Sequence, residues 1–294
     1  MLKNAPERLR ELMAQGDLIW GPGVYDGISA RIADAVGFPM LYMTGAGTAA
    51  SRIGQPDLGL TTMTEMADNV RVIAEASSVP VVADCDTGFG GPINIARSVH
   101  SYEGAGAAGL HIEDQVFPKR CGHLDGKVVV SADEFAQRIR AAAAERYNRN
   151  FVIIARTDAR QPNGFEDALD RIKRAFDAGA DVGFLEGPKN MDEIERTVAE
   201  APGPMLLNVP SFGNTPMLKV DEIRNAGFRF AIFPAAAMMA AALAIRRALE
   251  TLKKEGSDAG PAEGKSPRDL FEMVGLEQAL AIDRRSGSTL FTTA

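Results

Sequence analysis

Short apolar runs alternate with longer amphipathic stretches along most of the chain. The runs are rich in Val, Ile, Leu and Phe, and the stretches between them, such as INIARSVHSYEGAG and EDALDRIKRAFDAGA, repeat apolar residues at helical spacing. Several helical stretches end in a glycine that suits a helix C-cap and returns the chain to a strand. The pattern predicts eight strands, at residues 18–26, 40–45, 79–86, 108–114, 151–158, 182–187, 204–209 and 228–234.

Eight strand-helix units predict a (β/α)8 barrel, the TIM barrel fold, for which roughly 250 residues is typical. A doubly wound open sheet is the main competitor. Each run is apolar in its body and ends in polar or charged residues, which a barrel would gather at one mouth and an open sheet would scatter. The polar positions at the strand ends are Asp26, Thr44, Asp84, Asp86, Glu113, Asp114, Arg156, Asp158, Glu186 and Asn208. Their distribution therefore favours the α/β barrel.

The composition changes near residue 255. The stretch KKEGSDAGPAEGKSP is a polar linker rich in Gly, Pro and Ser, and a helix-like stretch, PRDLFEMVGLEQALAID, follows it. We therefore expect a catalytic barrel over residues 1–254 and a linker with a helical segment over residues 255–294. A helix tethered after a completed barrel either packs back on it or reaches a neighbouring subunit.

Charge and cysteine content narrow the function. The chain of 294 residues has a net charge of −7 without basic runs, so nucleic acid and anionic membranes are disfavoured as partners, and a small molecule is favoured. No window is apolar enough to span a bilayer, and the N-terminus lacks the apolar region of a secretory signal. Two cysteines are too few for a disulfide framework, which fits a reducing cytoplasm.

Carboxylates crowd the ends of neighbouring strands. Asp84, Asp86 and Glu113 would meet at the barrel mouth, where such a cluster is costly unless a cation neutralises it. Cys85 alternates to the opposite side of its strand, so the available ligands are all oxygen atoms. An all-oxygen site suits Mg²⁺ or Mn²⁺. The alternative is that these aspartates cap the helices that follow.

An arginine near the end of a predicted strand needs a partner. Arg156 points to the same side as Asp158, and a buried arginine is costly unless it meets a carboxylate. Glu186 on the next strand and a substrate carboxylate both remain open as that partner. Asn208 adds a neutral hydrogen-bonding group, consistent with a polar acid as ligand.

The segment QVFPKRCGHLDGK forms a long connection after the fourth predicted strand. Long connections of this kind often serve as lids. Lys119, Arg120 and His123 would attract an anionic substrate and tune the Cys121 thiol. A free cysteine is most often a small buried hydrophobic residue, yet an exposed loop gives it nothing to pack against. The pattern favours a catalytic thiol.

These motifs resemble those of the isocitrate lyase and phosphoenolpyruvate mutase superfamily. The resemblance rests on KRCGH after HIEDQ, on YMTGAGTAA and VVADCDTGFGG upstream, and on ARTDA downstream, and it extends from PGVYDGISARI to the LFEMVGL region. It implies a (β/α)8 barrel, a helix exchanged between subunits and commonly a tetramer. It also implies Mg²⁺ near Asp84 and Asp86, with Asp57 and Glu113 around it. The implied substrate-binding residues are Tyr42, Thr44, Gly45, Ala46, Asp84, Gly122, His123, Arg156, Glu186 and Asn208.

Within the superfamily, the loop cysteine distinguishes carbon–carbon lyases from enzymes of phosphorus chemistry. The implied reaction is a retro-aldol cleavage of a 2-hydroxy dicarboxylic acid. A base takes the hydroxyl proton, the C2–C3 bond breaks, and a 2-oxo acid such as pyruvate leaves. Cys121 protonates the remaining carbanion, and Arg156 and Glu186 are the other catalytic candidates. The general base stays unassigned.

The resemblance also bears on the substrate. Methylisocitrate lyases carry an arginine shortly after the eighth-strand proline, where this chain has FPAAAMM, with Met239 at about that position. Oxaloacetate hydrolases are expected to carry a serine where this chain has Pro234. The sequence therefore most resembles the 2,3-dimethylmalate lyase and petal-death protein branch, which implies an alkylated malate as substrate. Methylisocitrate cleavage, oxaloacetate hydrolysis and a non-catalytic barrel that binds a diacid remain the alternatives.

Overall fold

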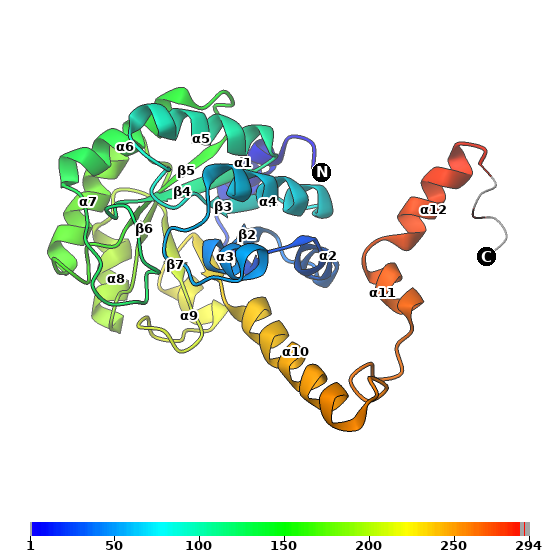
Figure 1. Cartoon of the computed structure of the whole chain (residues 1–294). Coiled ribbons are helices and arrows are strands. Elements are labelled where there is room, and N and C mark those ends of the chain that lie inside the picture. The colour runs from blue at the N-terminus through cyan, green and yellow to red at the C-terminus, as the bar shows by residue number, and fades with distance from the viewer. Residues whose placement is uncertain (1, 289–290, 292–294) are drawn as a thin grey trace. The chain divides into compact units, whose positions relative to one another are not determined.

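The computed structural model describes residues 2–288 and 291, and it forms a closed barrel of parallel strands in sequential order, β1 to β8 (Figure 1). The predicted barrel is confirmed, and the open sheet is excluded because β1 pairs with β8, with Ile19 opposite Phe230. Each of the eight predicted runs contains one strand. The strands are β1 Ile19–Val24, β2 Leu41–Met43, β3 Val81–Asp84, β4 Gly109–Glu113, β5 Val152–Thr157, β6 Val182–Leu185, β7 Met205–Asn208 and β8 Phe230–Phe233.

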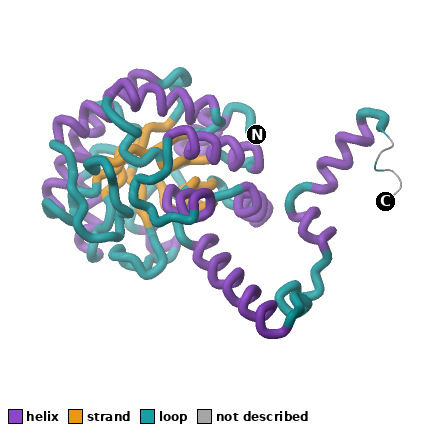
Figure 2. Tube along the Cα trace, viewed as in Figure 1, coloured by secondary structure: helices purple, strands orange, loops and turns teal. Residues whose placement is uncertain are grey.

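Helices surround the strands (Figure 2). They are α1 Ala5–Gln15, α2 Gly27–Val36, α3 Gly45–Ile53, α4 Met63–Ala76, α5 Pro92–Gly104, α6 Ala132–Glu145, α7 Phe165–Asp177, α8 Met191–Glu200, α9 Val220–Asn225, α10 Ala236–Glu255, α11 Pro267–Met273 and α12 Leu276–Arg285. Polar residues just after strands begin several of these helices. Asp26 caps α2 by accepting from the Ser29 N–H, and Thr44 caps α3 by accepting from the Gly47 N–H.

The strands are buried on both faces, as parallel barrel strands require. One apolar cluster, which includes Tyr42, Val82 and Phe184, fills the barrel interior with β-strand side chains. A second, which includes Ala83 and Cys85, packs strand residues of the other parity against the helices. Cys85 is fully buried there, as its predicted orientation away from the mouth requires.

The chain divides into two compact units, Met1–Met238 and Met239–Ala294. The composition placed the boundary at 254/255, but the units separate inside α10. A continuous helix shared by both units carries no loop signal in the sequence. Residues 289–290 and 292–294 of the predicted C-terminal segment lie outside the described part of the chain.

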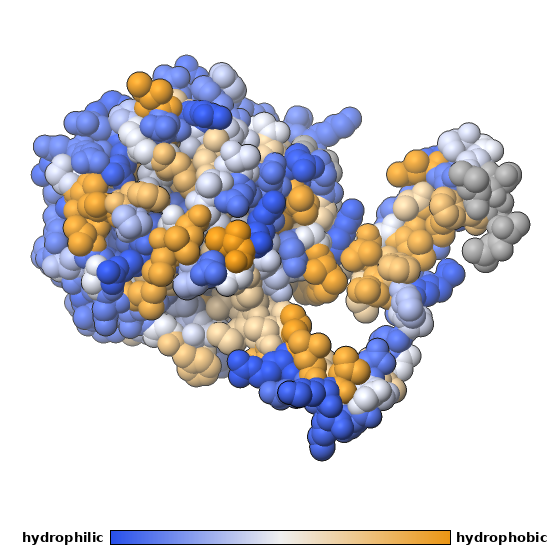
Figure 3. All heavy atoms as spheres, in the orientation of Figure 1, coloured by the Kyte–Doolittle hydropathy of each residue, from blue (hydrophilic) through white to orange (hydrophobic). Residues whose placement is uncertain are grey.

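The second unit contains two helices where the sequence pattern suggested one stretch. α11 ends at Met273, and Gly275, with φ of 99°, precedes α12 in the left-handed region. Glycine adopts that conformation without the penalty that a Cβ imposes, so Gly275 ends one helix and permits the next to start at a new angle. Exposed apolar side chains gather on these helices (Figure 3). They include Leu270, Phe271, Met273, Val274 and Ile282.

Within the described residues, none of the helices is both long and apolar enough to cross a membrane.

Candidate active site at the barrel mouth

A cavity of about 180 Å³ opens at the carboxyl ends of the strands. Most of the predicted substrate-binding residues line it. The lining residues are Tyr42, Thr44, Ala46, Gly47, Asp57, Asp84, Cys121, Gly122, His123, Arg156, Glu186, Asn208, Pro210, Pro234, Ala235 and Met238. Gly45, Asp86 and Glu113 do not line the cavity, but they contact residues that do. Gly45 and Asp86 contact Asp84, and Glu113 contacts Arg156.

Asp84, the last residue of β3, is held in a fixed orientation. The Gly45 N–H donates to its Oδ2 atom at 3.2 Å, and the Asp86 N–H donates to Oδ1 at 2.9 Å. A Cβ at position 45 would lie 2.4 Å from Asp84 Oδ2, so this close approach requires glycine. Burial raises the pKa of Asp84, but the neighbouring His111, Lys119 and Arg156 lower it by a larger amount, to about 2. The carboxylate is therefore ionised at neutral pH.

A tyrosine and a histidine approach the carboxylate of Asp84. The Tyr42 hydroxyl lies 2.9 Å from His111 Nε2 and 3.4 Å from Asp84 Oδ2. Burial lowers the pKa of His111 to about 4, so its imidazole is neutral at neutral pH. The sequence analysis did not single out His111. Residues two apart in a strand point to the same face, so the position of His111 two residues before Glu113 was the available signal.

The contacts of Lys119 contradict the prediction that it attracts substrate anions. Its Nζ atom lies 2.5 Å from Asp57 Oδ1 and 2.6 Å from Asp86 Oδ1, and its side chain is almost fully buried. Burial lowers the pKa of Lys119, but Asp86, Glu113 and Asp57 raise it well above its ordinary value. The ammonium group is therefore charged, and it neutralises two carboxylates beside the cavity.

The carboxylates predicted to bind a metal surround this region without forming a compact cage. Within the part of the chain that the structure describes, no three His, Cys, Asp or Glu side chains converge closely enough to coordinate one ion. Asp86 and Asp57 share Lys119, and Glu113 Oε2 faces Arg156 Nη1 at 3.4 Å. Glu113 Oε2 and Asp86 Oδ1 are both buried, and the contacts that the structure describes for them are these ion pairs with Arg156 and Lys119.

Arg156 is the centre of the charge network. Its Nε and Nη2 atoms donate to the two oxygens of Asp158 at 2.9 and 3.1 Å, in a bidentate pair. Arg156 Nη2 also lies 3.4 Å from Glu186 Oε2. The predicted ion pair with Glu186 is thus present but secondary to Asp158. The sequence predicted that Arg156 and Asp158 point to the same side, and this was the signal that Asp158 is the nearer partner.

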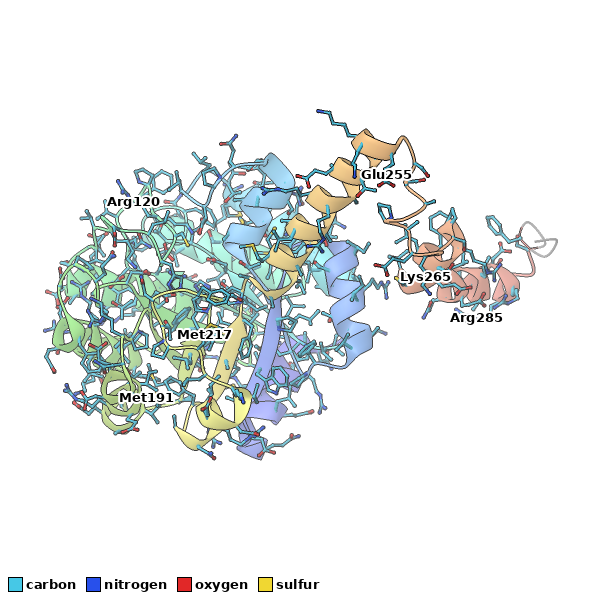
Figure 4. The ribbon with its side chains drawn as sticks, turned by 90° about the horizontal axis from the view of Figure 1, so that it is seen from below. Arg120, Met191, Met217, Glu255, Lys265 and Arg285 are labelled. Carbon is cyan, nitrogen blue, oxygen red and sulfur yellow. The ribbon has the colours of Figure 1, made fainter. Side chains whose placement is uncertain are left out.

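The loop between β4 and α6 brings Cys121 to the cavity. The Cys121 N–H donates to the Asp57 carbonyl at 3.1 Å, and the Gln115 side chain contacts the Arg120 backbone through both its amide atoms, at 2.7 and 3.0 Å. The Arg120 side chain instead lies at the surface, where it donates to the Asp125 carbonyl (Figure 4). Arg120 is therefore excluded from the predicted role of attracting substrate within the cavity.

Cys121 is partly buried rather than free of contacts, contrary to the expectation of an exposed loop. Burial is the main cause that raises the pKa of its thiol above the ordinary value of about 9. The thiol is therefore protonated at neutral pH and can act as an acid.

His123, Glu186 and Asn208 lie together in one part of the cavity lining. Asn208 Nδ2 donates to Glu186 Oε2 at 3.0 Å, and His123 Nε2 lies 3.3 Å from Glu186 Oε1. Burial lowers the pKa of His123, so its charged form is disfavoured in the ligand-free site. This part of the cavity lining offers hydrogen-bond donors and acceptors with little free positive charge.

Part of the cavity lining is apolar. Pro210, Pro234, Ala235 and Met238 form it, and the sequence analysis identified only Pro234 among them. Met238 lines the cavity, whereas Met239, the residue expected at about the position of the methylisocitrate lyase arginine, is exposed. Consecutive residues of a helix point about 100° apart, so the two methionines near the start of α10 face different ways.

A parallel barrel with a thiol, an arginine and ionised carboxylates at the carboxyl ends of its strands has the organisation of a barrel enzyme. The phosphoenolpyruvate phosphomutase family model matches residues 9–253. The chain therefore belongs to the phosphoenolpyruvate mutase/isocitrate lyase superfamily, and it is an enzyme whose similar relatives are named as lyases.

Two relatives illustrate the similarity. The chain is 40% identical to the 2,3-dimethylmalate lyase of Eubacterium barkeri, over 95% of this chain and 97% of the relative. It is 37% identical to the 2-methylisocitrate lyase of Halalkalibacterium halodurans, over 98% and 95% respectively.

Solved structures show the same fold. An oxaloacetate acetylhydrolase with 3,3-difluorooxalacetate superposes with a TM-score of 0.94 at 47% identity, covering 98% of each chain. A 2,3-dimethylmalate lyase superposes with a TM-score of 0.95 at 44% identity, covering 99% of this chain and 98% of that one. A phosphonopyruvate hydrolase with oxalate and Mg²⁺ superposes with a TM-score of 0.86 at 30% identity, covering 96% and 99%.

The two cysteines should differ sharply in reactivity. Because burial raises the pKa of Cys121, iodoacetamide should label it slowly at neutral pH, and the rate should still rise above about pH 10, where an ordinary thiol approaches its plateau. Cys85 should stay unlabelled until the protein unfolds, because it is fully buried. Peptide mass spectrometry of labelled samples checks both. A Cys121 labelling rate that levels off below pH 8 would contradict the raised pKa.

Proposed function

We propose that this protein is a Mg²⁺-dependent carbon–carbon lyase. Its proposed substrate is a 2-hydroxy dicarboxylic acid, namely 2,3-dimethylmalate or a similar alkylated malate. Cleavage would release a 2-oxo acid such as pyruvate together with a carboxylate. The observation that carries the proposal is the position of the partly buried Cys121 thiol, which lines the same cavity as Arg156, Asp84 and Glu186.

The residues divide the proposed reaction between them. A base at the mouth removes the C2 hydroxyl proton, the hydroxyl electrons form the carbonyl, and the C2–C3 bond electrons pass to the C3 fragment. Cys121 then donates its proton to C3, which leaves a thiolate that regains a proton before the next cycle. Arg156 binds a substrate carboxylate, with its orientation fixed by Asp158. Glu186 and Asn208 hold the polar end of the substrate.

The all-oxygen donor set fits the proposed Mg²⁺. Asp84 would be the nearest ligand, and Asp57, Asp86 and Glu113 would act on its hydration shell. Mg²⁺ commonly keeps several waters and uses one or two carboxylates, so a compact three-carboxylate cage is not required. The buried Glu113 Oε2 atom supports this reading, because Arg156 Nη1 approaches it only to 3.4 Å and leaves it able to accept a hydrogen bond from a metal-bound water. When bound, the ion supplies stabilisation of negative charge on the substrate.

The shape of the cavity supports an alkylated malate. The apolar lining residues Pro210, Pro234, Ala235 and Met238 suit methyl groups, which gain by leaving water. A third carboxylate beside them would need a cation, and these four residues supply none. We therefore place methylisocitrate second to a dimethylmalate.

Oxaloacetate hydrolysis is the other candidate, favoured by the 47% identity to the oxaloacetate acetylhydrolase structure. Pro234 weighs against it, because a proline side chain supplies no hydrogen-bonding group to the oxygen-rich oxaloacetate.

The second unit supports an oligomer, which we propose to be a homotetramer with exchanged C-terminal helices. α11 and α12 expose apolar side chains, and short isolated helices are marginal in water unless such a face is covered. A neighbouring copy of the barrel is the proposed cover. The two free thiols are compatible with the proposed cytoplasmic location.

A substrate panel tests the reaction. With Mg²⁺, 2-oxo acid release from 2,3-dimethylmalate should exceed that from 2-methylisocitrate at least tenfold, roughly the effect of a poorly matched carboxylate. Oxalate release from oxaloacetate should be lower still. EDTA should abolish turnover, and added Mg²⁺ should restore it. If no diacid turned over while oxalate bound with Mg²⁺, a non-catalytic barrel would replace the lyase.

Replacement of the thiol tests the proton donor. Cys121→Ala and Cys121→Ser should lower kcat by about 10²- to 10⁴-fold, the range for loss of a general acid. Cys85→Ala serves as the matched control and should keep kcat within about threefold, because Cys85 lies away from the cavity. Steady-state kinetics and thermal melts measure both. Near-normal turnover by Cys121→Ala would exclude the thiol as the acid.

The solution mass tests the oligomer. Sedimentation velocity should give a species near four times the 31.4 kDa chain mass. Truncation after residue 255 should reduce the number of subunits in the assembly, because it removes the exposed apolar helices α11 and α12. A full-length monomer would contradict the proposal.

A further inference from the structure

A second buried lysine lies in the loop that carries Cys121, and the proposed reaction does not use it. The Lys127 side chain is 3% exposed. Its Nζ atom donates to the carbonyl oxygen of Gly122 and lies 3.2 Å from Asp158 Oδ1. A buried ammonium group is costly unless it is paired, so these two contacts hold Lys127 in place.

Both partners of Lys127 belong to the cavity. Gly122 lies between Cys121 and His123, and all three line it. Asp158 forms the bidentate pair with Arg156. The Asp158 carboxylate is fully buried and forms ion pairs with two cations, Arg156 from β5 and Lys127 from the loop. Lys127 therefore connects the turn that holds the thiol to the group that orients Arg156.

The backbone at Gly122 rests directly on the charged pair. A Cβ at this position would lie 2.4 Å from Arg156 Nη2 and 2.9 Å from Glu186 Cγ. Any other residue would require either the turn or the paired side chains of Arg156 and Glu186 to move. The approach therefore depends on glycine, and the Gly122 carbonyl is the point at which Lys127 holds that approach.

Other contacts fix the ends of the loop. The Val116 N–H donates to the Val128 carbonyl at 2.8 Å, and Gln115 bridges to Val129. Lys119 binds Asp57 and Asp86 before the turn. These contacts would persist without Lys127, so the loop should remain attached while the turn that carries the thiol loosens.

We propose that Lys127 is a positioning residue that latches the Cys121–Gly122–His123 turn over the cavity by joining the Gly122 carbonyl to the Asp158–Arg156 pair. Its kinetic consequence rests on the proposed lyase function, but the latch itself does not. Because Asp158 is shared, the position of the thiol and the orientation of Arg156 depend on one carboxylate.

Labelling of Cys121 tests the latch without a substrate. Lys127→Met removes the charge and the donor but keeps most of the side-chain length. It should raise the rate of iodoacetamide labelling at Cys121 about 10- to 100-fold, the range for losing a hydrogen bond to a charged group. Lys127→Gln keeps a neutral donor and should give an intermediate rate. It also carries the test if Lys127→Met does not fold.

Two controls separate a latch from general destabilisation. Lys173→Met removes an exposed lysine, whose side chain is 45% exposed, and should leave the labelling rate unchanged. Cys85 is fully buried, so its labelling reports global unfolding, and it should stay unlabelled in the Lys127 variants. Labelling of Cys121 at the wild-type rate in both Lys127 variants would overturn the latch. So would labelling of Cys85 in step with Cys121.

A double-variant cycle tests the connection to Gly122. Gly122→Ala should also expose the thiol, because its Cβ collides with Arg156. If both residues act through one docked turn, Lys127→Met should add little labelling in the Gly122→Ala background. Full multiplication of the two effects would overturn the shared turn.

Kinetics then link the latch to the reaction. With any diacid that turns over, Lys127→Met should lower kcat by about 10- to 100-fold and change KM by less than about threefold, because Lys127 is absent from the cavity wall. A change in KM alone would contradict a positioning role. If no diacid turns over, the lyase proposal fails, while the labelling results still decide the latch.

Discussion

The charge balance around Arg156 is the interaction on which the mouth of this barrel depends. Asp158 holds the guanidinium group in a bidentate pair, while Glu113 and Glu186 approach it at 3.4 Å. Buried carboxylates at such separations would repel one another strongly without a shared cation. Burial lowers the pKa of Arg156, but Asp158, Glu113 and Glu186 raise it by more, and Asp158 has the largest effect of the three. The resulting pKa lies well above the ordinary value. Arg156 is thus a permanent cation around which the other groups are arranged.

The loop between β4 and α6 completes that balance. It contributes two buried lysines, Lys119 to Asp57 and Asp86, and Lys127 to Asp158. One loop conformation therefore neutralises carboxylates from both sides of the turn. The same conformation brings Cys121 to the cavity and buries it enough to raise the pKa of its thiol. The chemical state of the proposed acid and the position of the loop consequently have one physical origin.

The features that local periodicity controls were predictable from the sequence. All eight strands lie within their predicted ranges, because buried parallel strands read as apolar runs that end in polar groups. The convergence of Asp84, Arg156, Glu186 and Asn208 followed from the fold itself. The partners of Lys119 and Lys127 did not, because they depend on how a long loop folds over the mouth, which no periodicity specifies. Met238 was missed for a related reason, since the helical phase at the start of α10 is set by the barrel end and not by the preceding proline.

The cavity lining combines charged residues that are held by several partners with apolar residues that are not, and this difference bears on how related sites can accept different substrates. Asp84, Arg156 and Glu186 are held by several buried partners each, so substitution of any of them would leave other charges uncompensated. Pro234, Ala235 and Met238 form no ion pairs that the structure describes, and their replacement would alter only shape and hydrogen bonding at the cavity wall. Substitutions at the end of β8 and the start of α10 are therefore the least costly way to change specificity. The relatives fit this view, since proteins named for dimethylmalate, methylisocitrate and oxaloacetate share much of their sequence with this chain.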